Sequence, residues 1–111
     1  MLDESRFHAL ANATLMHIND QLEQAYDEGS LEELDFDEGG GILTIITPDE
    51  VTFVVSKHAP SGQIWLASPL SGGLHFDFDE NAQEWRLRDG RSLKTLLAGD
   101  LKQSCGLHVV L

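Results

Sequence analysis

Apolar residues recur along the first quarter of the chain with the spacing of a helix. From Asp3 to about Asp27 they follow one stripe of a helical wheel, made of Phe7, Leu10, Ala11, Leu15, Ile18, Leu22, Ala25 and Tyr26. The opposite face of the wheel carries Asn12, Met16, Asp20, Glu23 and Asp27. The spacing therefore predicts a long amphipathic helix whose second half presents carboxylates to solvent.

The pattern changes to a period of two after Gly29-Ser30. Leu34 and Phe36 alternate with acids at Glu33, Asp35 and Asp37, which is typical of a half-buried strand. Further short β-rich runs, separated by Gly, Pro and Asp turns, cover residues 42–47, 51–56, 63–67, 74–78 and 84–87. The chain therefore predicts a meander of five or six antiparallel strands.

A second helical stripe follows the strands. Leu93, Leu96, Leu97 and Leu101 share one face, and Ser92 is a plausible N-cap. We expect the apolar tail 107–111 to pack between the ends of the two helices. The order of helix, meander and helix predicts one α+β domain over residues 1–111, with two helices packed on one face of the antiparallel sheet.

Charge narrows the possible partners of such a domain. The 111 residues include 7 Lys and Arg against 19 Asp and Glu, a formal charge of −12. This balance disfavours nucleic acid and anionic membranes, and no apolar run approaches membrane-spanning length. A single cysteine, Cys105, fits a reducing compartment, so we expect a cytoplasmic protein.

The acids are concentrated in one part of the chain. No Lys or Arg lies between Arg6 and Lys57, whereas this interval contains Asp20, Glu23, Asp27, Glu28, Glu32, Glu33, Asp35, Asp37, Glu38, Asp49 and Glu50. If the first strand packs beside the first helix, these carboxylates form a ridge that repels itself unless a cation binds it. Carboxylates suit iron, manganese, calcium and magnesium, while a merely solvated acidic face is the alternative.

Other chemistry is sparse in the sequence. It contains no nucleophile elbow, phosphate-binding loop, dinucleotide fingerprint or CxxC pair, so we expect no enzyme. Of the five histidines only His8, near Glu4, is a credible metal ligand, and we expect the others to be solvated. Trp65 alternates with Ile64 and Leu66 and should face solvent, as a partner-binding residue or as one side of a cross-strand aromatic contact.

The stretch that starts at Lys57 is similar in sequence to a known protein family. The run Lys57-His58-Ala59-Pro60-Ser61-Gly62-Gln63-Ile64-Trp65-Leu66-Ala67-Ser68-Pro69-Leu70-Ser71-Gly72 resembles the sheet motif of the frataxin family. Trp85, Asp89-Gly90 and the Ser92-Leu93 helix start are similar to its C-terminal third, and the bacterial CyaY-type branch is the most similar. The chain departs from the family where Ser56-Lys57-His58 replaces Asn-Lys-Gln.

The resemblance implies a function in iron-sulfur cluster assembly. It implies weak carboxylate binding of iron (Fe²⁺ or Fe³⁺), docking on a cysteine desulfurase and the iron-sulfur scaffold protein, and a monomer when iron-free. By position, the metal residues would be Glu4, His8, Asp20, Glu23, Asp27, Glu28, Asp35 and Asp37, and the partner-binding residues would be Trp65, Gln63 and Glu33. A ferroxidase and an acidic adaptor without a metal role are the alternative functions.

Overall fold

The computed structural model describes residues 3–27, 34–107 and 109–111. The elements, in chain order, are helix α1 (Glu4–Asp27), strands β1 (Asp35–Gly39), β2 (Ile42–Ile46) and β3 (Thr52–His58), the 3₁₀ turn η1 (Ala59–Ser61), strands β4 (Gln63–Ser68), β5 (Gly72–Asp79) and β6 (Glu84–Arg86), and helix α2 (Leu93–Cys105). The alternation predicted a strand that includes Leu34, but β1 begins at Asp35, and Glu33 lies outside the described residues.

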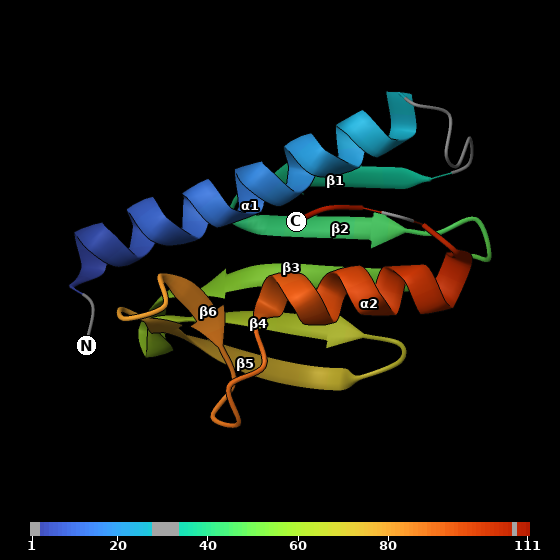
Figure 1. Ribbon diagram of the computed structural model, residues 1–111. Coiled ribbons are helices and arrows are strands. Elements are labelled where there is room, and N and C mark those ends of the chain that lie inside the picture. Colours follow the sequence, from blue (N-terminus) through green and yellow to red (C-terminus); the bar gives the residue numbers. More distant parts are fainter. Residues whose placement is uncertain (1–2, 28–33, 108) are drawn as a thin grey trace.

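The six strands form one antiparallel sheet in sequential order, β1 to β6. Both helices cover the same face of this sheet, and Figure 1 shows them in front of the strands, α1 over β1 and β2 and α2 over β3 and β4. The predicted α+β architecture is therefore confirmed, with the larger of the two expected strand numbers. Because side chains alternate along each strand, the register assigns every strand residue to the helix side or to the opposite side, called the open face below.

The helix side of the sheet holds the core. Leu43, Ile45, Phe53, Val55, Ile64 and Phe76 are fully buried there, together with Phe7, Leu15, Ile18 and Leu22 of α1 and Leu97 and Leu101 of α2. Burying each such side chain contributes about 1.5 to 3 kcal/mol. Tyr26 is a correction, because its side chain is 45% exposed. It lies in the last turn of α1, where Phe36 of the edge strand packs against only part of its ring.

The ends of the helices are capped by side chains and glycine. The backbone N–H of Arg6 donates to Asp3 Oδ1 at 2.8 Å, and the N–H of Thr95 donates to Ser92 Oγ at 3.2 Å, which confirms Ser92 as an N-cap. Gly106 ends α2 with φ of 75°.

The described tail beyond α2 packs against the core as predicted, apart from Val110, which is 85% exposed. Leu107 is buried, while Val109 and Leu111 pack against the core. Figure 1 shows the tail running back between α1 and α2, and His17 Nε2 lies 2.7 Å from the carbonyl oxygen of Leu111. His17 is therefore bound to the tail instead of being solvated.

Candidate functional site

Four exposed carboxylates lie on the first helix and on the edge strand of the sheet and form what we call the acidic edge: Asp20 and Glu23 on α1, and Asp35 and Asp37 on β1. Alternation places Phe36 towards the helices, so its two acidic neighbours point away from the core, as predicted. Within the described part of the chain, none of the four forms an ion pair with Lys, Arg or His. The residues that the structure describes therefore leave the acidic edge unneutralised.

The two pairs of acids do not share one face, which corrects the expectation of a single ridge. Asp35 and Asp37 lie opposite Ile46 and Thr44 and project on the open face. Asp20 and Glu23 project from α1, which covers the other side of the sheet. Among residues 3–27, 34–107 and 109–111, no three His, Cys, Asp or Glu side chains are placed to hold one metal ion. The four carboxylates are exposed, hard oxygen donors of the kind that divalent cations such as iron, manganese, calcium and magnesium accept.

Three of the predicted site residues lie partly or wholly outside the part of the chain that the structure describes. Asp27 is the last residue of α1, but its side chain is not described. Glu28 and Glu33 lie outside the described residues, so their places relative to the acidic edge stay predictions.

The N-terminal end of α1 differs from the sequence expectation. Glu4 and His8 were predicted to belong to the same metal-binding ridge as Asp20. His8 Nε2 lies 4.0 Å from Glu4 Oε1, but His8 Nδ1 lies 3.1 Å from the Nζ atom of Lys57. The ammonium group of Lys57 already occupies this end of the helix. Glu4 and His8 therefore differ from the acidic edge, which has no basic side chain beside it in the described chain. The signal missed in the sequence was the alternation that turns Lys57 towards α1.

Trp65 projects on the open face, as its alternation with buried Ile64 and Leu66 predicted. It is only half-exposed, however, because two imidazoles cover its faces. The ring centroids of His58 and His75 lie 3.7 and 4.2 Å from that of Trp65, at interplanar angles of 16° and 11°. These three residues form what we call the Trp65 stack. Both histidines were expected to be solvated. His75 is indeed exposed, whereas His58 is half-buried, and the expectation did not foresee that both rings stack on the indole.

Register explains the Trp65 stack. Trp65 pairs directly with His75 on β5, and His58 lies two residues beyond Ser56, the β3 partner of Trp65. Residues at these positions share one face of an antiparallel sheet within reach of aromatic side chains. The sequence contained this signal, because hairpin register could have aligned His58, Trp65 and His75, but single histidines without metal spacing gave no reason to look.

Two hydrogen bonds in series hold the N–H edge of the indole. Trp65 Nε1 donates to Gln63 Oε1 at 3.0 Å, and Gln63 Nε2 donates to Asp77 Oδ1 at 3.2 Å. Gln63 and Trp65 therefore lie together on the open face, and their role in binding a partner stays a prediction. A hollow of about 160 Å³ adjoins the indole, with Val54, Ser56, Ala67 and Gly73 in its lining. Because these side chains are small, the exposed part of Trp65 borders open space.

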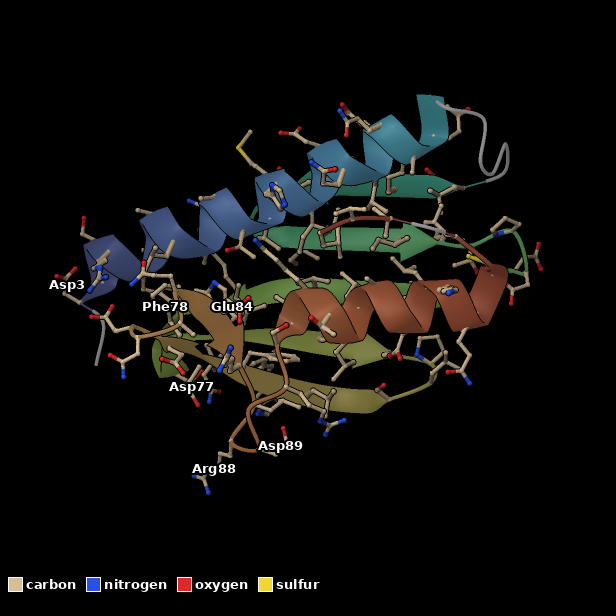
Figure 2. All side chains as sticks on the ribbon, viewed as in Figure 1. Asp3, Asp77, Phe78, Glu84, Arg88 and Asp89 are labelled. Atoms are coloured by element: carbon tan, nitrogen blue, oxygen red, sulfur yellow. The ribbon has the colours of Figure 1, made fainter. Side chains whose placement is uncertain are left out.

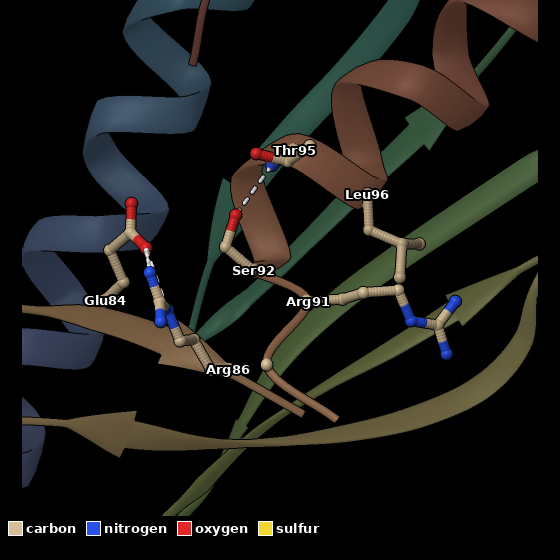
Figure 3. A pocket seen from close by; sticks show the side chains of 7 residues that line it. Glu84, Arg86, Arg91, Ser92, Thr95 and Leu96 are labelled. Atoms are coloured by element: carbon tan, nitrogen blue, oxygen red, sulfur yellow. Dashed lines mark hydrogen bonds and ion pairs between the residues drawn. The ribbon is translucent and has the colours of Figure 1, made fainter. Parts of the chain in front are cut away.

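A second hollow, of about 400 Å³, lies at the start of α2 (Figure 3). Its charged residues are already paired, since Arg86 binds Glu84 at 2.9 Å and Arg91 binds Asp89 at the same distance. Asp89 and Arg88 project from this end of the molecule, far from β1 (Figure 2). The hollow therefore shares no residue with the acidic edge or the Trp65 stack.

Cys105 carries no sign of reactivity. Its thiol donates to the carbonyl oxygen of Leu101 at 3.3 Å, and burial raises the pKa of the Cys105 thiol. Thiolate is the reactive form of cysteine, so a raised pKa suits a structural residue.

These features describe a small α+β domain with an acidic edge and an aromatic stack on the open face of its sheet. Residues 1–107 match the family model described as a frataxin-like domain, and the chain belongs to this family. It is 36% identical to the mitochondrial frataxin of Arabidopsis thaliana over 96% of this chain and 57% of that protein. It is 33% identical to the iron-sulfur cluster assembly protein CyaY of Pseudomonas fluorescens (strain Pf0-1), over 95% of this chain and 91% of that protein.

A solved structure supports the same assignment. A trimeric frataxin from the yeast Saccharomyces cerevisiae, in its ferrous complex, matches with a TM-score of 0.73 and 34% identity, over 85% of this chain and 83% of that one. The chain spans just over half the length of the mitochondrial frataxins from Arabidopsis thaliana and Dictyostelium discoideum. The described residues contain no helix long and apolar enough to cross a membrane.

Proposed function

We propose that this protein serves iron-sulfur cluster assembly as a binding protein, not as an enzyme. In this proposal it docks on the cysteine desulfurase and scaffold protein and carries ferrous iron loosely on its acidic edge. The name of its CyaY relative, an iron-sulfur cluster assembly protein, supports the process. The observation that carries the proposal is the acidic edge itself, whose four described carboxylates have no basic partner in the described chain.

Docking follows from charge and from contact together. An uncompensated acidic surface attracts a basic patch from a distance and raises the rate of encounter, and salt screens this attraction. The Trp65 stack lies on the open face, where it adds a rigid aromatic surface next to a hollow. The desulfurase is the proposed partner of the acidic edge, and the scaffold is the proposed partner of the open face.

Iron binding is supported by donor chemistry. Exposed carboxylates are hard ligands for ferrous iron, and like charges near one another gain from a shared cation. The ferrous complex of the yeast relative supports iron association in the family. With ligands on both sides of β1, the iron would be held by few donors at a time, which suits weak binding and transfer.

An anaerobic ferrous titration monitored by NMR amide signals tests the iron part, with calcium as the comparison ion. Asp20, Glu23, Asp35 and Asp37 should shift or broaden together at micromolar to millimolar iron. No change at these residues would remove iron from the proposal. Oxygen uptake after anaerobic loading tests the ferroxidase alternative, because a carrier shows no saturable catalytic rate.

Binding of the desulfurase, measured by surface plasmon resonance at several salt concentrations, tests the docking part. The association rate should fall steeply as salt rises. An association rate that does not depend on salt would contradict docking through the acidic edge.

A further inference from the structure

Lys57 extends from the sheet to α1 through a passage that a glycine leaves open. It lies on the helix side of β3, opposite Ile64 of β4, and its backbone N–H donates to the carbonyl oxygen of Gly41 at 2.9 Å. A Cβ on Gly41 would approach Lys57 Cε to 2.5 Å, so any larger residue there would push the lysine stem off this path. Gly41 also has φ of 81°, a conformation that glycine adopts readily.

The ammonium group at the end of this stem is held by two acceptors on successive turns of α1. Lys57 Nζ lies 2.9 Å from Asn12 Oδ1 and 3.1 Å from His8 Nδ1. Ammonium has donors and no acceptor, so His8 Nδ1 must accept. The ring proton of a neutral His8 is therefore on Nε2, the nitrogen that faces Glu4 Oε1 at 4.0 Å.

This arrangement uses the only lone pair that a neutral imidazole offers. A metal ion binds histidine through such a lone pair, so binding at Nδ1 would require the ammonium to leave. Binding at Nε2 would require the proton to move to Nδ1, where it would face the ammonium group. A positive charge within about 3 Å also opposes an approaching cation directly.

We propose that Lys57 is a built-in competitor of metal ions at the N-terminal end of α1. Its ammonium group occupies the site that Glu4, His8 and Asn12 would otherwise offer and so confines metal binding to the acidic edge. Lys57 thus determines where iron binds, without being a ligand. The inference deepens the proposed iron-carrying function and rests on it for its biological meaning, but the exclusion of metal from His8 can be tested independently.

The test compares the wild-type chain with Lys57→Met, which keeps most of the stem and removes the charge. Lys102→Met, on the exposed last turn of α2, is the control because it changes the net charge equally. Cobalt(II) is the probe, monitored by NMR broadening of the His8 ring and of the backbone amides. In Lys57→Met the His8 signals should broaden at cobalt concentrations on the order of tenfold lower than in the wild type or in Lys102→Met.

Equal cobalt sensitivity of His8 in all three proteins would overturn the inference. The tautomer gives a second test that needs no variant: long-range proton–nitrogen spectra of the metal-free wild type should place the ring proton on Nε2, and a proton on Nδ1 would overturn it. If His8 gains cobalt in Lys57→Met while the acidic edge never responds, the iron-carrying proposal fails and the competitor role stands. If the acidic edge responds and His8 in Lys57→Met does not, the competitor role of Lys57 fails and the iron-carrying proposal stands.

Discussion

The acidic edge and the Trp65 stack lie on the same small domain but are built in opposite ways. At the acidic edge, Asp20 and Asp37 are exposed and, within the described chain, unpaired, so their charge acts through solvent over a distance. In the Trp65 stack both faces of the indole are covered by imidazoles, and its N–H is bonded to Gln63. The edge therefore needs no exact geometry, whereas the stack offers a rigid shape that acts only on contact.

This difference predicts that the two regions control different steps of binding. Charge governs how often partners meet, and a buried aromatic contact governs how long they stay together. Neutralising the edge should therefore change the association rate, and truncating the stack should change the dissociation rate.

Trp65→Ala should have the largest effect. Loss of a central aromatic contact costs about 2 kcal/mol or more in binding, so dissociation from the scaffold should be at least roughly thirtyfold faster. The salt dependence of association should not change. Surface plasmon resonance measures both rates, and Val54→Ala, also on the open face, serves as the control that removes apolar surface without removing the stack.

If Trp65→Ala and Val54→Ala weaken binding equally, the stack is only part of a general apolar surface. If neither changes the dissociation rate, the open face is not a docking surface for the scaffold.

Removing two charges from the acidic edge should have the next largest effect. Asp20→Asn with Asp37→Asn should slow association with the desulfurase roughly threefold or more at low salt and reduce its salt dependence, while dissociation changes little. The matched control is Glu80→Gln with Asp89→Asn, which removes the same charge from acids already paired with Arg6 and Arg91. Equal slowing in both double variants would mean that net charge matters and its position does not.

The architecture could be predicted from the sequence because each helix and strand has its own spacing of apolar residues. The stripe of α1, the alternation around Phe36 and the Ser92 cap all predicted elements that the structure confirms. Tyr26 failed because periodicity describes the direction in which a side chain points, and not how much structure lies above it. Beside the edge strand β1 there is too little structure to cover the Tyr26 ring.

The candidate site was predictable residue by residue but not as an arrangement. Exposure of Asp20 and Asp37 followed from local pattern, yet their positions on opposite sides of the sheet depend on where α1 crosses β1. The contact of Lys57 with His8 joins residues far apart in the chain through a gap at Gly41. The alternation of β3 gives the side of the sheet on which Lys57 lies, but which residues of α1 it meets depends on tertiary packing.

His75→Ala should have a smaller effect, and on the free protein. Aromatic pairs contribute about 0.5 to 1.5 kcal/mol beyond the area they bury, so the free energy of unfolding should fall by roughly that amount in urea titrations. One face of Trp65 also becomes open to water, so iodide should quench tryptophan fluorescence more strongly, whereas Trp85 stays buried. Unchanged quenching would mean that His75 does not cover the indole in solution.

The smallest expected effect concerns stability, and it tests whether the acidic edge is strained. Asp20→Asn with Asp37→Asn should raise the free energy of unfolding by a few tenths of a kcal/mol at low salt, because it relieves repulsion between unpaired carboxylates. The gain should disappear at high salt, where that repulsion is already screened. Urea unfolding at two salt concentrations measures it.

The contrasting case is Asp89, where the backbone N–H of Arg91 donates to Oδ1 at 3.0 Å and holds the pKa of Asp89 below its usual value. A lowered pKa means that the ionised group favours the folded state, so this contribution is present above the ordinary Asp pKa and is lost as the pH falls through the lowered value. Asp89→Asn should therefore lower the free energy of unfolding slightly at neutral pH and leave it unchanged at strongly acidic pH. If neutralising Asp89 stabilises the protein as much as neutralising Asp20 and Asp37, the acids act only through total charge and the acidic edge is no distinct region.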